Sequence, residues 1–158
     1  MSRPAAAFLL ILVVAAGCRL KEEPSTLIPP PPDVAAPPPD AIRTSSGLAS
    51  KMLQIGFSNV RPTSRSRVRV NYTGWTPDGK MFDSSVPTGQ PVEFGVDEVI
   101  PGWKEGLQLM VVGEKRRFWI PGALAYGEPD KSSAVAPRPG EQPKGTLVFD
   151  IELLRVTN

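Results

Sequence analysis

The side chains best placed to act together in this chain are aromatic and aliphatic, and they gather near its middle. From residue 68 to residue 72 apolar and polar positions alternate, as they do along a strand with one buried face. Trp103, Leu107 and Met110 recur at helical spacing and form the apolar face of a short helix. Asp83 lies in the same stretch. These residues predict a small aromatic pocket with one acid at its rim and no nucleophile beside a base.

The composition excludes several kinds of chemistry. Histidine is absent from the 158 residues, and Cys18 is the single cysteine. The chain therefore has no Ser-His-Asp or Cys-His nucleophile, no histidine zinc site, no internal disulfide and no CxxC pair. The net charge of +2 creates no field strong enough to indicate a nucleic-acid partner. We expect a site that works without a cofactor, a metal ion or nucleic acid.

The first residues have the pattern of an export signal. Arg3 precedes a short apolar run over residues 5–16, which is typical of a secretory signal peptide and too short to span a bilayer as a stable helix. The small residues directly before Cys18 resemble a bacterial lipobox, although Ala15 stands where that pattern prefers Leu. This pattern predicts a signal peptide at residues 1–17 and a lipidated Cys18 as the first residue of the mature protein.

An ordinary signal peptide cut nearby is the alternative, and it would leave Cys18 as an unpaired exported thiol. If cleavage occurs at Cys18, the following residue is Arg19 rather than Asp, which indicates the outer membrane by the sorting rule of enteric bacteria. The expected location is the bacterial cell envelope, either lipid-anchored on the periplasmic side of the outer membrane or free in the periplasm.

Residues 18–46 are rich in proline and show no apolar periodicity. Eight of the 19 prolines fall here, so we expect a disordered tether without a packed core. In polyproline II conformation, at about 3.1 Å per residue, it would reach on the order of 60–80 Å. The segment could instead present a PxxP ligand or serve as a substrate of its own domain.

The remainder of the chain reads as mostly β. Alternation over residues 114–120 and again over residues 147–154 predicts two longer strands, each with two distinct faces. Antiparallel strands with a short helix against one face fit an α+β domain.

Six fragments in this order resemble the FKBP-type peptidyl-prolyl cis-trans isomerases, in their bacterial envelope lipoprotein form: YTGW, DGKMFDSS, VIPGWKEGLQLM, VGEKRRFWIP, LAYGE and TLVFDIELLRV. The resemblance runs from Gly47 to Val156 and implies an isomerase domain over residues 47–158. The implied fold is α+β, a bent antiparallel β-sheet of five to six strands wrapped around one short α-helix. Among the partners implied are proline-containing exported proteins and macrolide inhibitors.

The activity that the resemblance implies is rotation about X–Pro bonds, which needs no covalent, acid/base or metal step. The barrier of about 18–20 kcal/mol comes from conjugation in the imide, and an apolar pocket favours the less polar twisted form. Two alternatives remain at this point: a weakly active or inactive chaperone or binding module of this fold, and an anchored structural protein whose pocket is incidental.

Nine site residues follow from the resemblance. Those implied to be catalytic are Tyr72, Phe82, Asp83 and Tyr126, and those implied to bind substrate are Phe94, Val99, Ile100, Trp103 and Phe149. Trp103 would form the floor under the proline ring. The Ile100 amide and the Tyr126 hydroxyl would donate to substrate carbonyls, and Asp83 would be held near Tyr72. Phe94 and Phe149 fit core packing as well as they fit a pocket wall.

The loop from Gly127 to Thr146 departs from the family pattern. It lacks the usual Ile-Pro-Pro approach to the last strand and is longer than in compact members. Its four prolines predict a semi-rigid loop. Because this loop overhangs the pocket in the family, macrolide binding and the choice of residue before proline depend on it.

Overall fold

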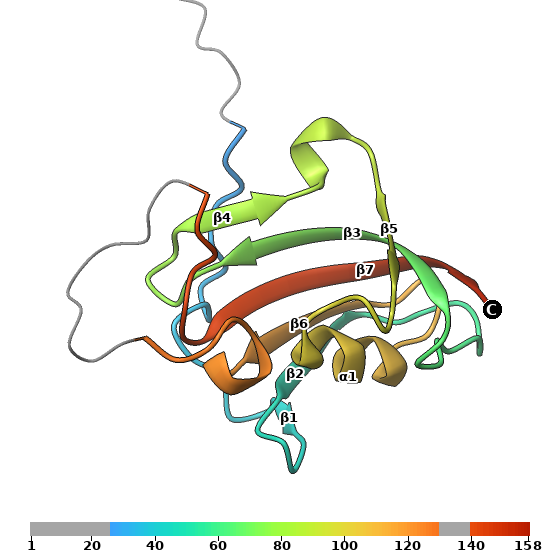
Figure 1. Cartoon of the computed structure of the whole chain (residues 1–158), viewed down its shortest axis with the longest axis horizontal. Helices are drawn as coiled ribbons and strands as arrows, with labels where there is room; N and C mark the ends of the chain where they lie inside the picture. Colours follow the sequence, from blue (N-terminus) through green and yellow to red (C-terminus); the bar gives the residue numbers. More distant parts are fainter. Residues whose placement is uncertain (1–25, 130–139) are drawn as a thin grey trace, which may run out of the picture.

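The computed structural model describes residues 26–129 and 140–158, which form one antiparallel sheet and one α-helix (Figure 1). The strands are β1 (Ile42–Arg43), β2 (Ala49–Gln54), β3 (Arg67–Trp75), β4 (Met81–Ser84), β5 (Val92–Gly95), β6 (Lys115–Ile120) and β7 (Leu147–Thr157). The helix is α1 (Pro101–Leu109), and two 3₁₀ turns follow β4 and β6, η1 (Val86–Thr88) and η2 (Gly122–Leu124). The strand order is β1-β2-β6-β7-β3-β4, and β5 also pairs with β3.

The predicted fold class is confirmed, an antiparallel sheet with one short helix. The strand number differs, since the described residues form seven strands instead of five or six. The difference has two causes. The two-residue β1 adds an edge to β2, and the outer edge of β3 is shared, with β5 along its first half and β4 along its second.

One face of the sheet packs against α1 and makes the main core. Alternate residues of β7, from Leu147 to Leu153, point to this face and are at most 3% exposed. They meet Trp103 and Leu107 of the helix. The period-two alternation predicted for the last strand therefore corresponds to a real division between two faces.

Two glycines let α1 lie very close to β6. A Cβ atom at Gly102 would lie 2.4 Å from the Ile120 side chain, and one at Gly106 would lie 2.7 Å from Phe118. Any larger residue at either position would push the helix away from the sheet. The contact is therefore steric, and it sets how closely the helix packs on the sheet.

The opposite face of the sheet is covered at one end by residues 26–43, which we call the strap. Val34 is buried there against Ala49, Trp75, Trp119 and Val148. Figure 1 shows the strap, in blue, reaching the sheet behind β4, on the side away from α1. It forms a second, smaller apolar cluster on the back of the strands that carry the main core.

Polar contacts fasten the strap to the sheet. The indole N–H of Trp75 donates to the Ile28 carbonyl at 3.0 Å, and that of Trp119 donates to the Asp33 carbonyl at 3.1 Å. Arg117 binds Asp150 through two hydrogen bonds, at 2.6 and 2.8 Å, and also binds Asp33. Burial alone would lower the pKa of Arg117, but these two carboxylates raise it, so the guanidinium stays charged.

These contacts correct the prediction of a tether without packing up to residue 46. Its described part, from residue 26 onward, is held to the sheet at Ile28, Asp33 and Val34, and β1 lies inside the range assigned to the tether. Proline has no N–H to donate, but it leaves every carbonyl free to accept. The two tryptophans of the sheet use two carbonyls of this proline-rich segment.

The predicted signal peptide, Cys18 and the first residues of the tether lie outside the described residues, as do residues 130–139 of the long loop. Across residues 26–129 and 140–158, no helix has both the length and the apolar character needed to cross a bilayer.

We expect the strap to contribute to stability. A chain that begins at Gly47 should have a free energy of unfolding lower by about 2–4 kcal/mol than a chain that begins at Thr26, because Val34 and two indole hydrogen bonds are lost. Urea unfolding of the two chains measures the difference. Trp119→Phe in the longer chain should lose about 2 kcal/mol or more, since it removes the N–H that binds the Asp33 carbonyl and part of a buried ring. Equal stability of the two chains would contradict an integral strap.

Candidate active site

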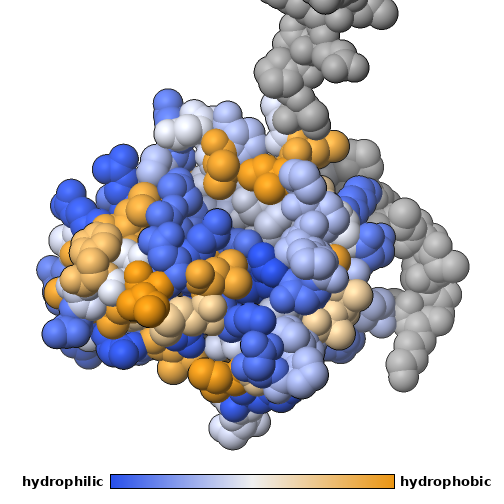
Figure 2. Space-filling view, turned by 180° about the vertical axis from the view of Figure 1, so that it is seen from behind, coloured by the Kyte–Doolittle hydropathy of each residue, from blue (hydrophilic) through white to orange (hydrophobic). Residues whose placement is uncertain are grey.

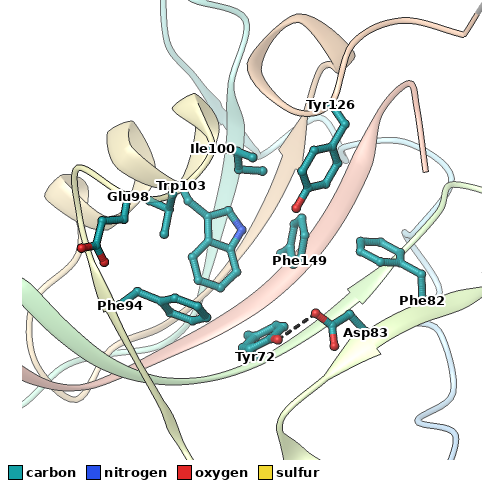
Figure 3. A pocket seen from close by; sticks show the side chains of 10 residues that line it. Tyr72, Phe82, Asp83, Phe94, Glu98, Ile100, Trp103, Tyr126 and Phe149 are labelled. Carbon is teal, nitrogen blue, oxygen red and sulfur yellow. Dashed lines mark hydrogen bonds between the residues drawn. The ribbon is translucent and has the colours of Figure 1, made fainter. Parts of the chain in front are cut away.

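A cavity of about 290 Å³ opens between the sheet, the start of α1 and the segment after η2 (Figure 3). The residues that line it are Tyr72, Phe82, Asp83, Phe94, Glu98, Val99, Ile100, Trp103, Tyr126 and Phe149. All nine residues singled out from the sequence therefore lie around one space. They come from β3, β4, β5, β7, α1 and two connecting segments, so only the tertiary fold brings them together.

Trp103 forms the base of the cavity and is 5% exposed. Three aromatic rings surround it at nearly perpendicular angles: Tyr72 with centroids 5.2 Å apart, Phe149 at 5.3 Å and Phe94 at 5.5 Å. Edge-to-face packing of this kind is the favoured arrangement of aromatic pairs. Within the part of the chain described here, the buried indole N–H has no hydrogen-bond partner.

The first turn of α1 places this tryptophan. Ile100 is the N-cap residue and Pro101 occupies the first helical position, where its missing N–H is no loss. The Trp103 amide donates to the Ile100 carbonyl at 3.0 Å. In the described ranges, the Ile100 amide donates to no protein group, so it remains available at the wall of the cavity.

Tyr72 and Asp83 are joined at the rim. The Tyr72 hydroxyl donates to the Asp83 carboxylate at 2.8 Å, across the paired strands β3 and β4. The Tyr72 backbone is fixed in turn, because its amide donates to the Ser85 hydroxyl at 3.0 Å and its carbonyl accepts from the Ser85 amide at 3.0 Å. Burial raises the pKa of Tyr72, and the hydrogen bond to Asp83 and its charge raise it further.

Phe82 and Phe149 form one wall, with ring centroids 5.4 Å apart at 85°. Gly74 on β3 makes room for both rings, because a Cβ atom there would lie 2.7 Å from each. Phe149 is 3% exposed and belongs to the main core, yet it also lines the cavity. Phe94, on β5, is half-buried; it packs against the main core and also lines the cavity. Both residues therefore contribute to the core and to the pocket wall.

Tyr126 stands at the entrance, and its side chain is 40% exposed. Figure 3 shows its hydroxyl directed into the cavity, above Phe149. Burial, and then the charge of Asp83, raise the pKa of Tyr126. The next residue, Gly127, has a φ of 96° and accepts a hydrogen bond from the Gly145 amide at 2.8 Å. That bond closes the base of the long loop beside the pocket.

Glu98 lines the cavity and was missed from the sequence. Its carboxylate accepts from the Gly95 amide at 3.0 Å and lies 3.6 Å from the Arg67 guanidinium. Both contacts hold the turn between β5 and α1. An acid that bonds back to an amide three residues earlier gives a weak sequence signal, since most exposed acids in turns look the same.

The site therefore offers aromatic walls, a flat indole base and hydroxyl and amide donors near the opening. It contains no nucleophile with a neighbouring base. A five-membered apolar ring fits this space, with a polar peptide group at the rim.

The comparisons with known proteins agree with this geometry. A family model described as FKBP-type peptidyl-prolyl cis-trans isomerase matches residues 58–154. The chain is 44% identical over 113 residues to the isomerase FkpA of Aeromonas hydrophila, covering 72% of this chain and 39% of that protein. It is 46% identical over 113 residues to the FKBP-type 22 kDa isomerase of Escherichia coli, covering 72% and 52%.

The crystal structure of FkpA from Escherichia coli superimposes with a TM-score of 0.65 at 41% identity, over 76% of this chain and 53% of that one. The chain thus spans about half or less of the length of these relatives. The match to the family model covers most of the described domain, including every residue that lines the cavity. The chain belongs to the FKBP-type peptidyl-prolyl cis-trans isomerase family.

Proposed function

We propose that this chain is a peptidyl-prolyl cis-trans isomerase that acts on exported proteins. The observation that carries the proposal is the buried Trp103 indole at the base of an aromatic cavity, with the Tyr72–Asp83 pair at its rim. Family membership supports the reaction class. The chain's own activity and clients are proposed here, because it spans only part of its relatives' length.

The cavity can favour the transition state by its polarity. A planar X–Pro imide is conjugated and dipolar, whereas the twisted imide has lost that conjugation. Aromatic walls solvate the planar form worse than water does. The twisted form is less polar, so it loses less solvation free energy when it enters the cavity. With the proline ring on Trp103, the bond that rotates would lie between Phe82 and Tyr126, near the opening.

Hydrogen-bond donors then hold the chain on either side of the rotating bond. We assign the Ile100 amide and the Tyr126 hydroxyl to substrate carbonyls, since both residues line the cavity and neither group has a hydrogen-bond partner in the described structure. Asp83 is fixed by the Tyr72 hydroxyl at 2.8 Å, so its second oxygen faces the rim. Each tenfold acceleration needs about 1.4 kcal/mol, which a few such contacts can supply.

For location, we propose that Cys18 is lipidated and that the domain is anchored in the bacterial cell envelope, on the periplasmic side of the outer membrane. The small residues before Cys18 and the Arg19 that follows it support this assignment. Lipidation also removes the only thiol of an exported chain.

The activity can be tested with residues 26–158, which keep the strap. We expect catalysis of cis-trans isomerisation in a proline-containing peptide, and we expect Phe82→Ala and Asp83→Ala each to lower kcat/KM about tenfold or more with little change in fold. Phe57→Ala is the control, because Phe57 is 82% exposed and lies outside the cavity. A folded chain without rate enhancement would point to a binding module or chaperone instead of an enzyme.

The value of kcat/KM should not change with pH around neutrality. The pKa values of Tyr72 and Tyr126 both lie above the ordinary tyrosine value of about 10, so both hydroxyls stay protonated. We expect a constant kcat/KM from pH 6 to about pH 9. On the alkaline side, stability should fall above about pH 10, where the unfolded chain releases tyrosine protons before the folded chain does. A bell-shaped profile centred near pH 7 would exclude this site model.

Lipidation is tested on the mature protein from bacterial membranes. Mass spectrometry of the amino-terminal peptide should find Cys18 as the first residue with acyl groups attached. A free amino terminus at any other residue would refute the lipid anchor while leaving the isomerase assay unaffected.

A further inference from the structure

We propose that the strap keeps the isomerase domain close to the membrane, with the β4 edge of the sheet against the lipid surface. The inference rests on the proposed lipidation of Cys18. It concerns a surface, the exit patch, made of the apolar side chains of Leu27, Ile28 and Val86. The partner is a phospholipid surface.

Few residues separate the proposed anchor from the part of the strap that is bound to the sheet. If residues 18–46 formed one tether, the domain could stand on the order of 60–80 Å from its anchor. The strap is fixed to the sheet from Ile28 onward, through the Trp75 indole and the Asp33 contacts. Ten residues, from Cys18 to Leu27, separate the proposed anchor from this first fixed residue. Even when fully extended at about 3.3–3.6 Å per residue, they span no more than about 36 Å.

The strap begins at the β4 edge of the sheet. Ile28 lies beside β4, since its amide contacts the Met81 sulfur at 3.3 Å and its carbonyl accepts from Trp75 at 3.0 Å. The next part of the strap stays at the same edge, because a Cβ atom at Gly79 would lie 3.1 Å from the Pro30 ring. With Cys18 anchored, the β4 edge of the sheet is therefore the part of the domain closest to the anchor.

This edge carries exposed aliphatic side chains. Leu27 is 64% exposed and Val86, in the turn after β4, is 47% exposed. Ile28 and Val86 line the same shallow hollow on the back of the sheet, of about 150 Å³. Figure 2 shows hydrophobic side chains gathered at this edge, next to the start of the described chain. Exposed aliphatic side chains beside a membrane anchor fit the boundary between headgroups and acyl chains.

A short tether makes even weak contacts of this kind effective. Joining two binding elements by a short flexible linker gives the second an effective concentration of about millimolar, and longer linkers lower it. The acyl chains at Cys18 would hold the exit patch within reach of the bilayer, and three aliphatic side chains would then bias the domain's orientation without binding lipid strongly on their own.

The orientation has a consequence for the substrate. The same strand β4 carries Phe82 and Asp83, which form the rim of the cavity on the other face of the sheet. Holding this edge at the lipid surface places the pocket opening within one domain width of the membrane. The clients favoured by this arrangement are proline-containing segments of exported chains that lie at the membrane surface, rather than chains free in the bulk.

The test uses the full chain, processed and lipidated in bacteria, in vesicles of phosphatidylethanolamine and phosphatidylglycerol. Val86→Cys is labelled with a polarity-sensitive dye, since the thioether at Cys18 cannot react. Leu27→Cys is a second reporter in case Val86→Cys folds poorly. Phe57→Cys is the matched control, because Phe57 is exposed and packs on Gly113, at the opposite end of β6 from the strap.

We expect the emission of dye at position 86 or 27 to shift to the blue on vesicles and to be quenched by brominated lipid, with neither effect at position 57. A Gly-Ser insert of about twenty residues after Ser25 should remove most of the shift. If the protein is lipidated but the dye at positions 86 and 27 stays in water, the membrane contact of the exit patch is refuted and the lipid anchor is not. An undiminished shift with the insert refutes the short tether, and a mature chain without lipid refutes the anchor and this inference together.

Discussion

Helix α1 touches β6 at two glycines, and the shape of the cavity depends on that contact. Gly102 and Gly106 allow the helix backbone to meet Ile120 and Phe118 where any side chain would collide. Trp103, between them in the same helix, is thereby set under the rings of β3 and β7 at centroid distances of 5.2 and 5.3 Å. A helix displaced by the width of one methyl group would open these aromatic contacts and change the depth of the pocket.

The strands that hold the cavity also hold the strap, on alternate residues. On β3, Tyr72 faces the cavity and Trp75 faces the strap, and on β7 Phe149 and Val148 divide in the same way. Residues on opposite faces of one strand are held together as one unit, because the β3–β7 pairing runs the whole length of β3. The ion pairs of Arg117 with Asp33 and Asp150 close the back face, and their partial burial makes each dependent on the others. The strap is therefore part of the domain that positions the site.

Much of this was predictable from the sequence, for a definite reason. Alternation on the strands and helical spacing at Trp103 and Leu107 follow directly from which faces are buried, and the structure has both. The pocket residues were found through the order of short motifs, because residues from five elements and two connecting segments carry no local signal of being neighbours. The strap was predicted as a free tether, since its binding depends on backbone carbonyls that composition cannot show. Glu98 was missed because its role lies in a turn amide and in a distant arginine, Arg67.

A site built this way depends on shape and polarity more than on protonation. Rotation about a prolyl bond transfers no proton, so the pocket needs donors that remain donors and walls that exclude water. Tyr72 and Tyr126 meet the first need, because burial and Asp83 raise their pKa values away from neutrality. The ring of aromatic side chains around Trp103 meets the second. Such a pocket can accept any accessible proline of suitable flanking shape, and its choice among clients then rests on access. If the protein is anchored as proposed above, access would be governed by the number of residues between the anchor and the strap and by the edge of the sheet at which the strap begins.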